Sequence, residues 1–168
     1  MLRRSSNASQ VHIPDESTLP RFDEVHIPPN LVVARPLRQI IEAMLRDSPT
    51  FRRQCARLGR SSSLTISVDH VLFALRARSQ AVTDFSIDDE GRRVARVQLG
   101  QAADREEVLA HEFEHIIEQL DGVDLASLAK SATASVRRTD ADRFETERAI
   151  AAGRQVVREI RTARRSRM

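Results

Sequence analysis

The 168-residue chain has no tryptophan and no tyrosine, and only one cysteine and one lysine. Because Cys55 has no second thiol to pair with, an intrachain disulfide and an all-thiolate zinc site are both excluded. The sequence also lacks the roughly 18-residue apolar run that a membrane helix needs, and the shorter apolar run of a signal peptide. We therefore expect a soluble cytoplasmic protein without a membrane span.

The domain organisation is predicted from composition and periodicity. Residues 1–34 contain four prolines and no sustained helical or strand period, which is typical of an extended or disordered leader. Residues 35–163 have the length of a single domain. Residues 164–168 are rich in arginine, and we expect them to form a frayed basic tail.

The domain is predicted to be α+β. Helical spacing of apolar residues predicts a backing helix over 36–58, which the sequence Asp47-Ser48-Pro49 either breaks or restarts. Alternating apolar residues and the turn-forming segment 88–91 predict a small antiparallel sheet over 64–99, although 71–75 fits a strand or a short helix. Two further helices are expected over 104–120 and 141–163.

A possible metal site lies on the helix expected over 104–120, which contains the motif His111-Glu112-Phe113-Glu114-His115. Histidines four residues apart project side by side from a helix and can bind one zinc ion, with the intervening Glu112 as a general base. An apolar stripe is predicted on the opposite side of the helix, formed by Leu109, Phe113, Ile116 and Leu120. One face would therefore pack in the core while the other lines a cleft.

A catalytic zinc site needs a third protein ligand and one open position. The acidic candidates are Glu118, Asp121, Glu145 and Glu147. Glu118 shares the histidine face, but three ligands on one helix rarely converge on a tetrahedron. Asp121 stands where metzincin-type sequences place a third ligand, but Glu118 occupies the position of the glycine in that motif. On a helical wheel of 141–163, Glu145 lies at the edge of a face of small and apolar residues, whereas Glu147 points toward solvent. A carboxylate beside an apolar face needs neutralisation, which favours Glu145.

With the later segment that begins Phe144-Glu145-Thr146-Glu147, the motif resembles the gluzincin clan, above all minimal gluzincins and the catalytic cores of CAAX-type proteases. The resemblance implies a zincin-like fold, with His111, His115 and Glu145 as zinc ligands and Glu112 as the base. It also implies that an edge strand, here expected at 94–99, binds extended peptide. Two positions depart from the pattern. Ala149 stands where CAAX-type proteases have an aspartate, and the absent tyrosine leaves His70 or an arginine to stabilise the oxyanion.

These observations favour a zinc-dependent metallopeptidase that acts on peptides or proteins. The alternative is a catalytically weak or inactive zincin-fold protein that binds a metal or a partner. A third class, nucleic-acid binding, is suggested only by the arginines that follow residue 153. These arginines are explained more simply as solvated side chains whose positive charges complement the negative end of the helix dipole. We therefore do not expect a nucleic-acid partner.

Overall fold

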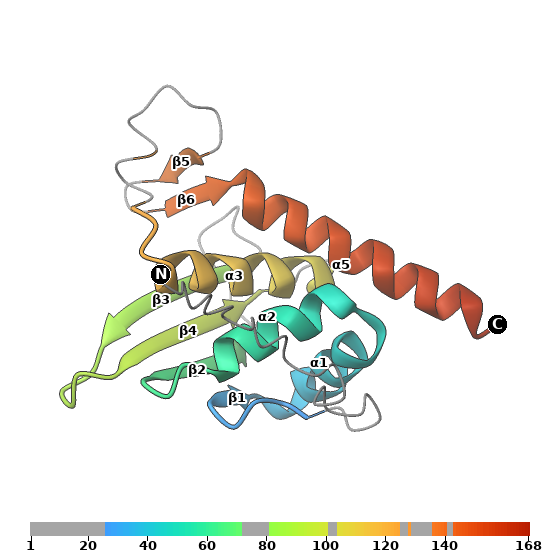
Figure 1. The fold of residues 1–168 in the computed structure, drawn as a ribbon, viewed down its shortest axis with the longest axis horizontal. Coiled ribbons are helices and arrows are strands. Elements are labelled where there is room, and N and C mark those ends of the chain that lie inside the picture. The colour runs from blue at the N-terminus through green and yellow to red at the C-terminus, as the bar shows by residue number, and fades with distance from the viewer. Residues whose placement is uncertain (1–25, 72–80, 101–103, 125–127, 129–135, 141–142) are drawn as a thin grey trace, which may run out of the picture.

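The computed structural model describes residues 26–71, 81–100, 104–124, 128, 136–140 and 143–168, and it has the predicted α+β composition. Most of the proposed leader lies outside the described residues. Figure 1 shows the arrangement of the elements. In chain order they are β1 (Leu31–Val33), α1 (Arg35–Asp47), α2 (Pro49–Gly59), β2 (Leu64–His70), β3 (Ala81–Ile87), β4 (Arg93–Leu99), α3 (Arg105–Leu120), β5 (Val136–Asp140), β6 (Arg143–Thr146) and α5 (Glu147–Ser166).

The main sheet has four strands in the order β1-β2-β4-β3. β1 and β2 run parallel, β2 and β4 run parallel, and only β3 is antiparallel to its neighbour. The sheet is therefore mixed, and our expectation of an antiparallel sheet was wrong. That expectation rested on the alternation of apolar and polar residues, which shows which residues share a face of a strand but not which strands pair or in which direction. β1 also corrects the leader boundary, because Leu31–Val33 pair with β2 inside the leader that we had assigned to 1–34.

The expected edge strand is also corrected. Residues 94–99 belong to β4, which lies between β2 and β3, so the strand at that edge of the sheet is β3. The inner position of β4 agrees with its burial, since Ala95, Val97 and Leu99 are all fully buried.

The core lies on one face of the main sheet. Leu64, Ile66 and Val68 of β2 are buried on this face together with Ala95, Val97 and Leu99 of β4, while Thr65, Asp69 and Arg96 are exposed on the other face. Apolar residues of α1, α2, α3 and α5 belong to the same core cluster. The helices therefore cover one face of the sheet and leave the polar face to solvent, as is common in α+β proteins.

The predicted backing helix is divided into α1 and α2 at Ser48. Pro49 cannot continue the helical hydrogen bonds of α1, and the Ser48 hydroxyl caps α2 by accepting a hydrogen bond from Phe51 N at 3.0 Å. The carboxylate of Glu159, on α5, accepts hydrogen bonds from Thr50 N at 2.9 Å and from Thr50 Oγ1 at 2.7 Å. It thereby joins the positive end of α2 to α5.

The C-terminal segment departs from its prediction at both ends. Residues 143–146 form β6, which pairs with β5, and α5 begins only at Glu147. Glu145 therefore lies on a strand, and the helical wheel that favoured it was applied to the wrong structure. At the other end α5 continues through Ser166, so most of the tail that we expected to fray is helical. Arg164 and Arg167 pair there with Glu106 and Asp47, which gives these arginines a role within the fold.

None of the helices in the described part of the chain is long and apolar enough to cross a membrane.

Candidate metal centre

The two histidines of the motif project from the same side of α3. The opposite side of the helix is held in the core, where Leu109, Phe113 and Ile116 are fully buried and the Phe113 ring stacks on Phe51 with centroids 5.3 Å apart. This packing fixes the rotation of α3, so His111 and His115 face away from the core. Their side chains are largely covered, with 16% and 13% of their surfaces exposed.

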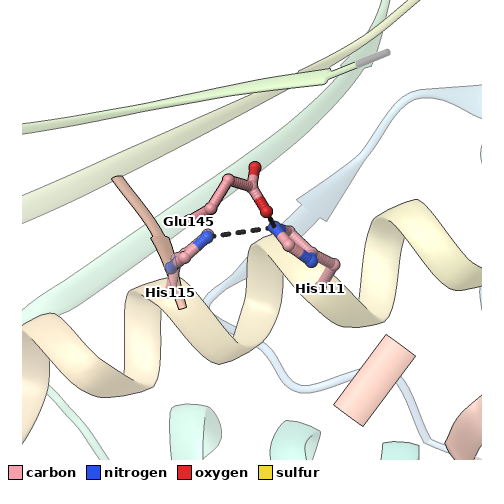
Figure 2. A group of neighbouring side chains, drawn as sticks. All are labelled: His111, His115 and Glu145. Atoms are coloured by element: carbon pink, nitrogen blue, oxygen red, sulfur yellow. Dashed lines mark hydrogen bonds and ion pairs between the residues drawn. The ribbon is translucent and has the colours of Figure 1, made fainter. Parts of the chain in front are cut away.

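Glu145 reaches the histidines from a separate element (Figure 2). Its Oε2 lies 3.4 Å from His111 Nε2, and the Nε2 atoms of the two histidines are 3.0 Å apart. One ligand atom from each of the three residues lies within 4.8 Å of the others. No other group of this kind occurs among the residues that the structure describes.

These separations fit a single tetrahedral ion. Zinc binds imidazole nitrogen and carboxylate oxygen at about 2.0–2.2 Å, so two ligand atoms in a tetrahedron are roughly 3.4 Å apart. The contacts from His111 Nε2 to His115 and to Glu145 are 3.0 and 3.4 Å. Two imidazoles and one carboxylate also match the donor set of known catalytic zinc sites. The three residues therefore suit zinc in their chemistry, and the two separations from His111 fit a tetrahedral ion.

The charges around the histidines also favour a cation. Burial by itself would lower the pKa of the His111 imidazole. The hydrogen bond and charge of Glu145, together with the charges of Glu112 and Glu118, outweigh burial and raise the pKa above its ordinary value. The same negative field would attract a divalent ion.

The other candidate ligands lie elsewhere. Asp121 accepts hydrogen bonds from Arg57 and Arg148, and it does not join the group formed by the histidines and Glu145. Glu147 is exposed in the first turn of α5 and is also outside that group. His70 ends β2, which β4 separates from β3. Its assignment to oxyanion stabilisation stays a prediction that no contact in the described structure supports.

Glu118 contacts His115 but does not join the group of candidate ligands. Its carboxylate is 3% exposed, and its Oε2 lies 2.9 Å from Nδ1 of His115, on the side of the ring away from His111. Its Oε1 accepts a hydrogen bond of 2.8 Å from the Thr146 hydroxyl. Thr146 follows Glu145 directly and caps α5. A carboxylate that holds the distal nitrogen of a metal-binding histidine fixes its tautomer and orientation, so Glu118 joins the position of His115 to that of Glu145.

We expect Glu118→Gln to lower the zinc affinity by about 10–100-fold, the range found when such outer carboxylates are replaced. The amide keeps the shape of the side chain but loses the charge that orients His115. Zinc affinity is measured by competition with a chromophoric chelator. Glu114→Gln is the matched control, because Glu114 is a buried carboxylate of the same helix that pairs with Gln54 and Arg148. Equal losses of zinc affinity in both variants would contradict the role of Glu118.

Gly153 lets α5 pack closely along α3. A Cβ atom at this position would lie 2.8 Å from the carbonyl oxygen of Glu107 and 3.5 Å from the Cβ atom of His111. The first distance is a clash with backbone, which cannot rotate away. The face of small residues predicted for the last helix is thus confirmed, because Ala149 and Gly153 are both buried.

Gly153→Ala should therefore destabilise the protein, although alanine is ordinarily favoured over glycine in a helix by about 0.5–1 kcal/mol. Overpacking costs about 1–3 kcal/mol and should exceed that gain. Urea unfolding measures the change in the free energy of unfolding. The substitution Ala151→Gly, at an exposed position of α5, measures the effect of helix propensity alone. If Gly153→Ala raises the free energy of unfolding by the amount that Ala151→Gly lowers it, the close approach of α3 and α5 is wrong.

Glu112 contacts the edge strand. Its Oε2 accepts a hydrogen bond of 2.6 Å from the hydroxyl of Thr83, which lies on β3. Thr83 and Glu112 are 29 residues apart, and no local sequence pattern could have joined them. The contact places the proposed base beside β3, the edge strand of the sheet.

Comparison with known proteins adds no relative: no family model, curated protein or solved structure matches the chain.

Proposed function

We propose that the protein is a zinc-dependent metallopeptidase with a zincin-like fold. The observation that carries this proposal is the convergence of His111, His115 and Glu145 from two separate elements, with Glu112 beside them. A structural zinc site is ordinarily closed by four protein ligands, whereas three ligands with an adjacent carboxylate match a catalytic site. The same residues carry the gluzincin resemblance of the sequence.

The chain's residues have separate tasks in this proposal. His111, His115 and Glu145 would hold the ion, and Glu118 and Thr146 keep His115 and Glu145 in place. When bound, zinc would act as a Lewis acid that polarises the peptide carbonyl and lowers the pKa of water. Glu112 takes a proton from the attacking water and delivers it to the nitrogen of the breaking C–N bond, so that water is divided between the new carboxyl and amino groups.

The first test is removal of the metal. We expect purified protein to cleave an unfolded protein such as reduced, alkylated casein, to lose this activity after dialysis against a chelator, and to regain it with one equivalent of zinc. Because the site is formed by folded elements, the apo protein should also unfold at a lower temperature than the zinc form. If cleavage persists without metal, the hydrolysis has another origin and the proposal fails.

A metal-binding protein without turnover is the alternative. The chain's lack of tyrosine, together with the position of His70 on β2, leaves the oxyanion stabiliser unassigned. Such a protein would bind zinc with the same three ligands but would not depend on Glu112. The Glu112→Gln variant described below therefore separates the two functions.

A further inference from the structure

β3 carries exposed apolar side chains close to the candidate metal centre. Thr83, Phe85 and Ile87 alternate along the strand and therefore share one face. Their partners in β4 are Val97, Ala95 and Arg93. Thr83 fixes the point of β3 that lies next to Glu112. Phe85 and Ile87 follow about 7 and 13 Å further along the strand, at the usual rise per residue.

Nothing in the part of the fold that the structure describes covers these two side chains. Phe85 is 36% exposed and Ile87 is 70% exposed. Single exposed apolar residues are ordinary, but here two lie in line on one strand face and lead away from a candidate active centre. Their neighbours on the opposite face, Asp84 and Ser86, are polar and exposed. The two large exposed apolar side chains of β3 therefore lie on the face from which Thr83 contacts Glu112.

The outer edge of β3 is open to a further strand. In the part of the chain that the structure describes, β3 pairs only with β4. An extended peptide can pair with such an edge through its backbone, while alternate side chains set specificity. Antiparallel pairing between a peptide and β3 would be slightly more stable per residue than parallel pairing. A peptide in that orientation would place the residues before the scissile bond beside Phe85 and Ile87.

We propose that Phe85 and Ile87 select substrates with apolar side chains at two alternate positions on the N-terminal side of the cleaved bond. This proposal rests on the peptidase function proposed above and adds a substrate class to it: extended protein segments with alternating apolar residues. Parallel pairing would reverse the direction and place the same preference on the C-terminal side, so the direction of the preference tests the alignment.

The test is to map cleavage sites in a complex peptide library by mass spectrometry, with the zinc-loaded full-length protein and with Glu112→Gln as the blank. We expect apolar residues to be enriched several-fold at two alternate positions within the four residues before the cleaved bond. Ile87→Thr and Phe85→Thr should each reduce the enrichment at one of these positions, because threonine keeps strand propensity but removes apolar surface. The matched control is Val32→Thr, at a 60% exposed apolar residue of β1, on the far edge of the sheet.

The outcomes separate the two proposals. Cleavage that depends on Glu112 but shows no apolar preference before the bond, or a preference only after it, overturns the specificity proposal and leaves the peptidase function standing. A preference that Ile87→Thr, Phe85→Thr and Val32→Thr change equally overturns it too. Absence of any cleavage that depends on Glu112 overturns the peptidase function, and the specificity proposal with it.

Discussion

Replacing Glu145 with alanine is expected to lower the zinc affinity by at least about 100-fold, beyond the range of about 10–100-fold for outer carboxylates. Glu145 is the only member of the group that comes from outside α3. Without it, two imidazoles on one helix are left to bind the ion. The affinity is measured by chelator competition, and the zinc content of the purified variant should fall well below one equivalent.

Glu147→Ala is the matched control for this prediction. It removes a carboxylate two residues further on, from an exposed position in the first turn of α5. Its zinc affinity should stay within about twofold of the wild type, with only the small loss of stability expected from the helix dipole, about 0.3–1 kcal/mol. If the two variants lose zinc equally, or if neither does, Glu145 is not a ligand.

Glu112→Gln should lower the rate of peptide hydrolysis by about 10²–10⁴-fold, the usual contribution of a general base, and leave the zinc content unchanged. The glutamine can still accept the hydrogen bond from Thr83, but it cannot take a proton from water at neutral pH. The rate is measured on a cleaved peptide found in the library experiment, and the zinc content on the same sample. Glu106→Gln on the same helix removes only an exposed ion pair with Arg164 and should be nearly neutral.

Two results would contradict this assignment. If Glu112→Gln loses zinc together with activity, Glu112 acts as a ligand or supports the fold, and the role of base is wrong. If cleavage continues at the wild-type rate, the hydrolysis does not depend on Glu112 and the peptidase proposal fails. If neither the wild type nor the variant cleaves while both bind zinc, the protein belongs to the alternative class, which binds metal without turnover.

Local sequence patterns predicted most elements of the fold and named all three members of the candidate metal group, although only the two histidines were placed on the correct element. The four-residue spacing and the opposite apolar stripe placed His111 and His115 side by side on α3, because helix geometry is local. Ser48 and Pro49 marked the division between α1 and α2 for the same reason. The parallel pairing of β2 with β4 could not be predicted, because strand order depends on contacts between residues distant in sequence.

Glu145 shows where local patterns reach their limit. It was favoured through a helical wheel, yet it lies on β6, one residue before the threonine that caps α5. Thr146 is a residue type preferred at helix N-caps and the acidic Glu147 follows it, a pattern that could have marked the start of α5. The sequence placed Glu118 on the histidine face of the helix, but we considered it only as a metal ligand. Its contact with Thr146 could not be predicted, because the two residues are 28 positions apart in the chain.

We expect one divalent ion to lie between two imidazoles of α3 and one carboxylate of β6. Anomalous X-ray diffraction at the zinc absorption edge, from crystals of the zinc-loaded protein, tests it most directly. We predict one strong anomalous peak within about 2.0–2.2 Å of His111 Nε2, His115 Nε2 and a Glu145 carboxylate oxygen. A zinc peak elsewhere, with the side chain of Glu145 turned away from both histidines, would contradict the account.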